Sequence, residues 1–228
     1  SLIVRPVATD GTPDSALDAA GQPVTTDPRT LTAAAEAEIV GSPDEIDWVR
    51  VATASRAALA VDPLTEGALG LYGLSLDGQD DPVSARETME AAAARSLRDP
   101  VPHIWLYDED LMRGDYSQAL DHADVVIRSQ PELRYTLYDS MRELVAIPEG
   151  VQALTAALRP NPPWRTEFLL RASDNPPALA GTTALFADLQ QSDSPPTNRE
   201  LGRLLTNLVQ AGAFQEALFL WLSVLPAD

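Results

Sequence analysis

The two histidines, His103 and His122, are the first residues whose type could support chemistry. They lie 19 positions apart, and we expect them on the two helices of one hairpin, where their rings could approach each other. A zinc site needs three or four protein ligands, and the chain contains no cysteine. His103 falls where a bulky packing residue is expected, so a structural role is favoured and no metal site is predicted.

Clustered carboxylates are the second candidates. Asp108, Glu109 and Asp110 are consecutive, and consecutive helical residues point in different directions, so the three cannot converge as a catalytic pair. We expect a solvated helix face, with Asp110 alone available to line a groove. The turn at 77–81 lacks the alternating oxygen ligands and the closing Glu of a calcium loop, which favours a capped turn. Since hydrolase and phosphate-loop motifs are also absent, the sequence predicts no catalytic residue and no cofactor.

The charge of the chain restricts its partners. With 34 acidic and 16 basic residues the net charge is −18, which disfavours nucleic acid because phosphates require clustered Lys and Arg. A basic protein or peptide segment fits this charge better, although the charge can also serve solubility alone. The longest apolar run, 217–222, is far shorter than the roughly 20 residues that span a membrane, so no direct membrane insertion is predicted.

The elements that position these residues are indicated by a repeat. Two series of residues recur every 34 positions: Ala85, Ala119 and Ala153, and Met89, Ala123 and Ala157. Prolines punctuate the chain every 31 to 37 residues between positions 63 and 196. A fixed period in this range indicates stacked helical hairpins, because one hairpin cannot bury its apolar face alone.

Breaker residues divide the chain into six expected hairpins. They pair 30–40 with 44–61, 65–76 with 82–97, 101–113 with 116–129, 132–145 with 148–158, 163–172 with 176–190, and 198–211 with 214–225. Ser42 is the expected N-cap of the second helix, followed by Pro43. Residues 1–28 lack apolar periodicity, so we expect a flexible acidic N-terminal tail or linker before one solenoid domain over residues 29–228.

Two hairpins carry a family resemblance. The segments GDYSQAL at 114–120 and GAFQEAL at 212–218 each hold a turn glycine, an aromatic residue and a small alanine in the same order. This pattern resembles the tetratricopeptide (TPR) repeat, in which the glycine allows a left-handed turn between antiparallel helices. The resemblance implies an all-α fold, a right-handed α-solenoid or superhelix of about six TPR-like helical hairpins. Pro148 and Pro176 depart from the pattern, so the fourth and fifth hairpins are only TPR-like.

The resemblance also implies a binding surface. In TPR proteins the first helix of each hairpin lines the concave groove. Two stripes at helical spacing would then face a protein or peptide partner: Trp105, Asp108 and Met112, and Arg199, Arg203 and Thr206. An alternative for Trp105 is packing on a neighbouring hairpin, since tryptophan is common both in cores and at binding hot spots. Trp164 is expected to seal the joint between the fourth and fifth hairpins.

The function that follows is a non-enzymatic protein-interaction scaffold that binds its partner in the concave groove. Residues 162–170 resemble a stretch of alphaproteobacterial TPR proteins associated with envelope polysaccharide production, which implies a place in a bacterial envelope assembly. The alternatives are an α-superhelical glycan-handling or peptidoglycan-cleaving module, or the scaffold half of a longer membrane-anchored protein. The start at Ser1 suggests a processed or excised chain, which favours a periplasmic or membrane-anchored location over a cytoplasmic one.

Overall fold

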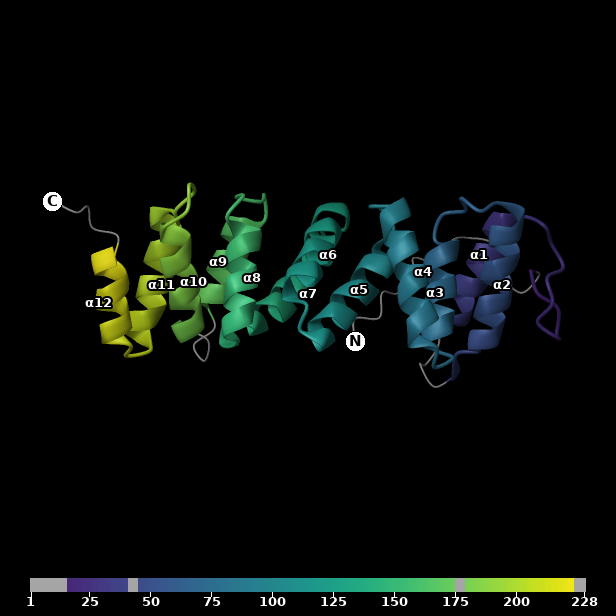
Figure 1. Ribbon diagram of the computed structural model, residues 1–228, viewed down its shortest axis with the longest axis horizontal. Helices are drawn as coiled ribbons and strands as arrows, with labels where there is room; N and C mark the ends of the chain where they lie inside the picture. The colour runs from purple at the N-terminus through teal and green to yellow at the C-terminus, as the bar shows by residue number, and fades with distance from the viewer. Residues whose placement is uncertain (1–15, 41–44, 175–178, 224–228) are drawn as a thin grey trace. The chain divides into compact units, whose positions relative to one another are not determined.

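The structure, a computed structural model, describes residues 16–40, 45–174 and 179–223 (Figure 1). These residues form twelve α-helices and one 3-10 helix, and their only β-type pairing is an isolated bridge between Leu17 and Pro23. The all-α prediction is therefore confirmed. In chain order the helices are α1 (Pro28–Glu38), α2 (Trp48–Val61), α3 (Ala68–Asp77), α4 (Pro82–Arg95), α5 (Pro100–Arg113), α6 (Tyr116–Ser129), α7 (Arg134–Met141), η3 (Arg142–Ala146), α8 (Pro148–Leu158), α9 (Arg165–Ser173), α10 (Leu179–Gln190), α11 (Asn198–Gln210) and α12 (Phe214–Ser223).

The chain divides into two compact units, residues 1–109 (unit 1) and residues 110–228 (unit 2), and the division falls within α5. This differs from the single domain expected over residues 29–228. In a chain of stacked hairpins each element contacts mainly its neighbours, so the apolar core is distributed along the sequence. The right-handed superhelix stays a prediction.

Aspartates cap the starts of three helices of unit 1, namely α1, α2 and α4. The Asp47 carboxylate accepts hydrogen bonds from the first backbone N–H groups of α2, so this helix begins at Trp48 and not at residue 44 as predicted. Asp27 and Asp81 cap α1 and α4 in the same way, and each is followed by a proline in the first helical turn. Ser42, the expected cap of α2, lies outside the described residues. Within unit 1, α1 packs on α2, α2 on α3, and α3 on α4.

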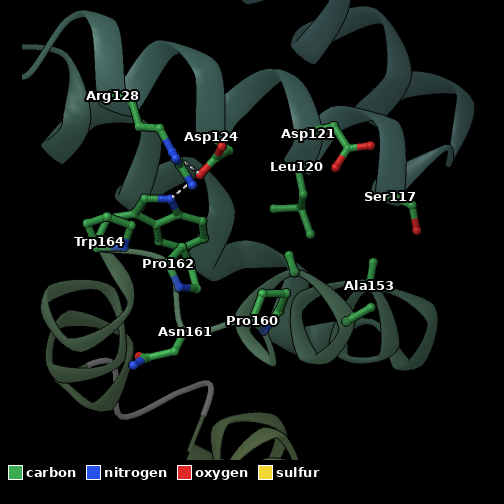
Figure 2. Close-up of a pocket in the computed structure, with 13 residues that line it drawn as sticks. Ser117, Leu120, Asp121, Asp124, Arg128, Ala153, Pro160, Asn161, Pro162 and Trp164 are labelled. Carbon is green, nitrogen blue, oxygen red and sulfur yellow. Dashed lines mark hydrogen bonds and ion pairs between the residues drawn. The ribbon is translucent and has the colours of Figure 1, made fainter. Parts of the chain in front are cut away.

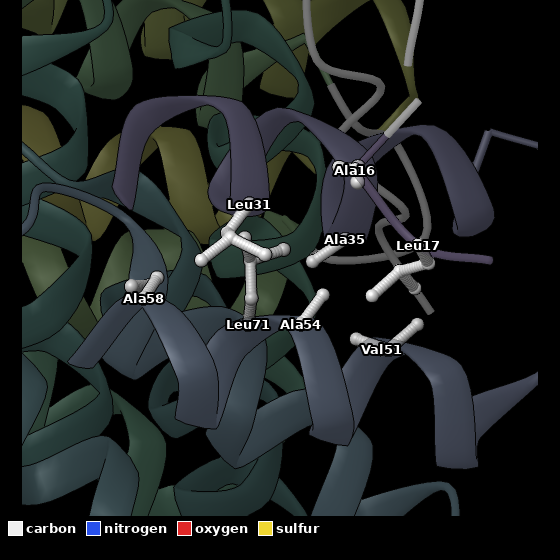
Figure 3. Close-up of a cluster of buried hydrophobic side chains, with 10 residues drawn as sticks. Ala16, Leu17, Leu31, Ala35, Val51, Ala54, Ala58 and Leu71 are labelled. Atoms are coloured by element: carbon white, nitrogen blue, oxygen red, sulfur yellow. The ribbon is translucent and has the colours of Figure 1, made fainter. Parts of the chain in front are cut away.

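The segment before α1 belongs to the core of unit 1. Ala16 and Leu17 are buried among apolar side chains of α1, α2 and α3 (Figure 3). The tail expected over residues 1–28 is therefore wrong for this part of the range, while residues 1–15 lie outside the described residues. Two buried apolar side chains are enough to hold a short segment against a helix pair, and too few to produce a periodic pattern.

The helices of unit 2 form two series. Helices α6, α8, α10 and α12 pack one after another, and α7, α9 and α11 do the same (Figure 1). The two series correspond to the second and the first helices of the expected hairpins. Neighbouring helices that pack in sequence order are what an all-α repeat requires.

Glycine turns precede α6 and α12, as the sequence predicts. Gly114 and Gly212 have φ angles of +81° and +76°. The N–H of the residue after each glycine donates to a carbonyl five positions earlier, at 2.8 Å after Gly114 and 2.9 Å after Gly212. This bond satisfies one of the last free carbonyls of the preceding helix. A side chain at either glycine would strain the backbone.

The repeat spacing shortens in unit 2. Ala119 is the fourth residue of α6, whereas Ala153 is the sixth residue of α8, because the two helices begin 32 and not 34 positions apart. Val151 takes the place of Ala119. Both alanines are buried, so they belong to the core, but the predicted 34-residue register does not continue into α8.

Helix α7 is shorter than the helix expected over residues 132–145. It ends at Met141, and the chain continues as η3. The backbone of η3 lies against two glycines, since a β-carbon on Gly150 of α8 or Gly181 of α10 would collide with the carbonyl of Leu144 or Val145. The missing side chains allow α8 and α10 to approach this 3-10 turn closely.

Candidate partner-binding groove

A groove of about 820 Å³ crosses the first helices of unit 2. It is formed by α7, α9 and α11 and by Pro163, which precedes α9. Most of its lining residues carry polar or charged side chains: Tyr135, Pro163, Thr166, Glu167, Leu170, Arg171, Asp174, Arg199, Gly202, Arg203 and Thr206. We call this surface the α7–α9–α11 groove.

The helical period brings these side chains to one face. On α11, Arg199, Arg203 and Thr206 are spaced i, i+4 and i+7, and on α9 the same spacing holds for Glu167, Arg171 and Asp174. The other face of α11 is anchored in the core by buried side chains: Leu201, Leu204 and Leu208. A capping box between Thr197 and Glu200 fixes the start of this helix. Groove residues therefore project from helices that are held from behind.

Bidentate ion pairs connect each first helix to the next. Arg171 of α9 donates to both carboxylate oxygens of Asp139 of α7, at 2.8 and 2.7 Å. Arg203 of α11 donates in the same way to Asp174 of α9, at 2.6 and 2.9 Å, and Asn207 adds a third bond at 2.9 Å. The hydrogen bonds from the arginines hold the pKa of both aspartates below its usual value. All four charges are thereby retained and fixed in place.

An aromatic cluster forms the α7 end of the groove. The Tyr135 hydroxyl donates to Glu167 Oε1 at 2.7 Å, and its ring meets Tyr138 edge-on, with 6.1 Å between centroids. Tyr138 packs in turn on Phe168, and burial raises the pKa of the Tyr138 hydroxyl to about 12. Arg171 lies 5.5 Å from the centroid of the Tyr135 ring, a cation–π distance. The half-exposed Tyr135 ring is thus held on three sides.

Arg199 differs from the other two groove arginines. Its side chain is exposed, and it makes no ion pair within the described part of the chain. Gly202, one turn further along α11, leaves open space where a side chain would stand. The Thr206 hydroxyl is occupied by its own helix, since it donates to the Gly202 carbonyl at 2.7 Å. The groove is therefore most accessible along α11, between Arg199 and Arg203.

The structure brings three of the six predicted site residues together. Arg199, Arg203 and Thr206 line the α7–α9–α11 groove. Trp105 and Asp108 belong to unit 1, and Met112, although in unit 2 and 78% exposed, does not line the groove.

Trp105 is engaged inside unit 1. Its indole N–H donates to Asp77 Oδ2 at 3.1 Å, and its ring packs on a cluster around Met89 and Leu106. A contact of Trp105 and Asp108 with a partner stays a prediction.

The groove residues on α7 and α9 are not among the predicted site residues. Their signal is a 32-residue spacing that parallels the α11 stripe. Tyr135, Glu167 and Arg199 form one row, and Asp139, Arg171 and Arg203 form the next. The expected 34-residue register places these residues out of phase, so the rows do not appear.

The candidate residues for metal and acid–base chemistry have structural surroundings. His103 is buried, with Nε2 3.3 Å from the Ser96 carbonyl oxygen. Asp110 is fully buried, with Oδ2 3.9 Å from His122 Nε2, so it neither belongs to a solvated face nor lines the α7–α9–α11 groove, as had been expected of it. Consecutive residues of a helix point in different directions, so Asp110 can face the core although its two acidic neighbours in the sequence do not. Among the described residues no group of three His, Asp or Glu side chains could hold a metal ion.

A second hollow, of about 550 Å³, lies between α6, α8 and the segment that leads into α9 (Figure 2). The Asp124 carboxylate of α6 accepts from the indole N–H of Trp164 at 2.7 Å and from Arg128 at 2.9 Å. Trp164 is buried, and its ring packs on Phe168 of α9. Trp164 thus joins α6, the second helix of the third hairpin, to the start of α9, whereas the predicted joint was between the fourth and fifth hairpins.

Comparison of the chain with protein-family models and with curated proteins finds no match in either set. No helix in the described ranges is long and apolar enough to cross a membrane. The geometry of the groove is therefore the basis for assigning a function.

Proposed function

We propose that the chain is a non-enzymatic interaction scaffold and that the α7–α9–α11 groove binds an extended segment of a protein partner. The observation that carries this proposal is the row of charged and aromatic side chains that lines the groove across three successive helices. A groove that crosses several repeats suits a ligand that is itself extended, and extended concave surfaces are how helical-repeat proteins bind.

The state of two carboxylates, Asp174 in the lining of the groove and Asp139 beside it, favours binding over catalysis. A general acid at neutral pH needs a raised pKa, as in glycoside hydrolysis. Asp139 and Asp174 have lowered pKa values because arginines donate to both of their oxygens. Carboxylates held in this way position neighbouring charges and do not exchange protons at pH 7.

The aromatic end supports the same proposal. Tyr135 is 44% exposed, yet its hydroxyl and its ring are both fixed by neighbours. A rigid aromatic side chain offers a large contact area at a small entropic cost, which is the property of residues that anchor bound peptides.

The test is a selection of binders from a random peptide library on the whole chain. Binding should be lost in Gly202→Phe, which fills the open space on α11, and kept in Ala184→Phe, which adds the same ring to an exposed position of α10. If both variants bind like the wild type, the groove is not the binding surface. Release of reducing ends from a glycan substrate, lost in a carboxylate variant, would instead establish an enzyme.

A further inference from the structure

Resting on the proposed function, the charges of the groove indicate the class of its partner. All 16 basic residues of the chain are arginines, and they are outnumbered by 34 acidic residues. The groove reverses this balance, because three arginines and two carboxylates line it. We propose that the α7–α9–α11 groove binds an acidic peptide segment, whose side-chain carboxylates pair with Arg199, Arg203 and Arg171.

The groove arginines have donors to spare. Arg171 and Arg203 use Nε and Nη2 for their aspartates, and neither Nη1 group makes a hydrogen bond within the described residues. A guanidinium carries five N–H donors, so each of these arginines can hold a carboxylate on its second edge. The aspartates meanwhile fix the planes of both guanidinium groups, which reduces the entropy that a ligand must remove.

Arg199 is the open position of the series. Arg203 finds its aspartate 29 residues earlier, and the residue 29 positions before Arg199 is Leu170. The carboxylate 32 positions earlier, Glu167, already accepts the Tyr135 hydroxyl. Neither position therefore supplies Arg199 with an ion pair. An acidic side chain of the bound segment can provide the carboxylate that Arg199 lacks.

The spacing of the helices predicts a spacing in the ligand. Packed helices lie about 8–10 Å apart, and a segment in the extended polyproline II conformation advances about 3.1 Å per residue with every third side chain on the same face. Acidic residues three positions apart would therefore reach arginines on successive helices. The expected ligand is an extended segment with Asp or Glu at every third position.

The probes for this inference are three labelled decapeptides that carry Glu, Lys or Gln at every third position among serines. Their binding to the whole chain is measured by fluorescence anisotropy at two salt concentrations. We expect the Glu peptide to bind in spite of the net charge of −18, and to bind more weakly at high salt.

Arg199→Gln should weaken binding of the Glu peptide about fivefold, the factor that corresponds to about 1 kcal/mol. Arg159→Gln is the matched control, because it removes the same charge from an exposed position outside the groove and should change binding by much less. Equal effects of the two variants would overturn the inference, since only the overall charge would then matter.

The steric variant separates the two proposals. If the Lys peptide binds and Gly202→Phe abolishes this binding, while the Glu peptide does not bind, the scaffold function stands and the acidic partner is refuted. If none of the three peptides binds in a way that Gly202→Phe abolishes, the inference is refuted, and the library selection then decides whether the groove function fails as well.

Discussion

Two glycine-to-alanine substitutions in unit 2 should change stability in opposite directions. Gly181 lies where a β-carbon would overlap the Val145 carbonyl, whereas Gly202 faces open space. In a helix, alanine is favoured over glycine by about 1 kcal/mol, and this gain is common to both sites. Overpacking costs about 1–3 kcal/mol, and we expect the upper end at Gly181 because the obstacle is a backbone atom that cannot rotate away.

The expected net effects are a loss of about 2 kcal/mol for Gly181→Ala and a gain of about 1 kcal/mol for Gly202→Ala. At about 3–4 °C per kcal/mol, the melting temperatures of the two variants should differ by about 10 °C. Differential scanning calorimetry of the whole chain measures this, and Gly202→Ala serves as the control for helix propensity. If Gly181→Ala had the same melting temperature as Gly202→Ala, α10 would not approach η3 as closely as described.

Other substitutions test the turns, the tryptophan of unit 1 and the ion pairs. Gly114→Val and Ala119→Leu should each lower the melting temperature by the equivalent of about 1–3 kcal/mol, through backbone strain and overpacking respectively; unchanged melting would refute the turn and the packing at those sites. Trp105→Ala should cost about 2 kcal/mol of stability and Trp105→Phe about 1 kcal/mol, because phenylalanine keeps the packing and loses the bond to Asp77; equal melting of the two would contradict this. Arginine hydrogen bonds hold the pKa of Asp139 and Asp174 below 3.8, so their ion pairs stabilise the fold fully above that pH and lose this effect as pH falls through the lowered values. The melting temperature should stay level from about pH 7 to 5 and should decrease once the pH drops below about 4. In Asp174→Asn this decrease should be shallower. The two aspartate side chains are 41% and 42% exposed, so each ion pair contributes at most about 1 kcal/mol.

Local signals explain which helices the sequence predicts well. The bounds of α6 and α8 agree with the predicted ranges at both ends. A turn glycine and an aspartate precede α6, and a proline begins α8, and these residues act within one helical turn. The break of α7 into η3 has no such signal, and the 3-10 turn packs against Gly181, which lies 35 residues beyond its end.

The site is predictable only in part for the same reason. The stripe of Arg199, Arg203 and Thr206 follows from the period of a single helix, which the sequence displays directly. The pairing of Arg171 with Asp139 needs the register between two helices, and that register changes from 34 to 32 residues between α4–α6 and α6–α8. The period of a single helix therefore reveals Arg203, one of the four residues in these two ion pairs, and not the other three.

The net charge of the chain is a poor guide to the groove. At physiological salt, charges farther apart than about 8 Å are largely screened, so a bound segment responds mainly to the side chains that it contacts. A charge of −18 spread over the chain affects the rate of approach, whereas Arg171, Arg199 and Arg203 decide which group can pair within the groove. The net charge of the whole chain predicts a basic partner, whereas the arginines of the groove predict an acidic segment. Because the groove arginines lie nearest to a bound segment, we expect them to determine the contact.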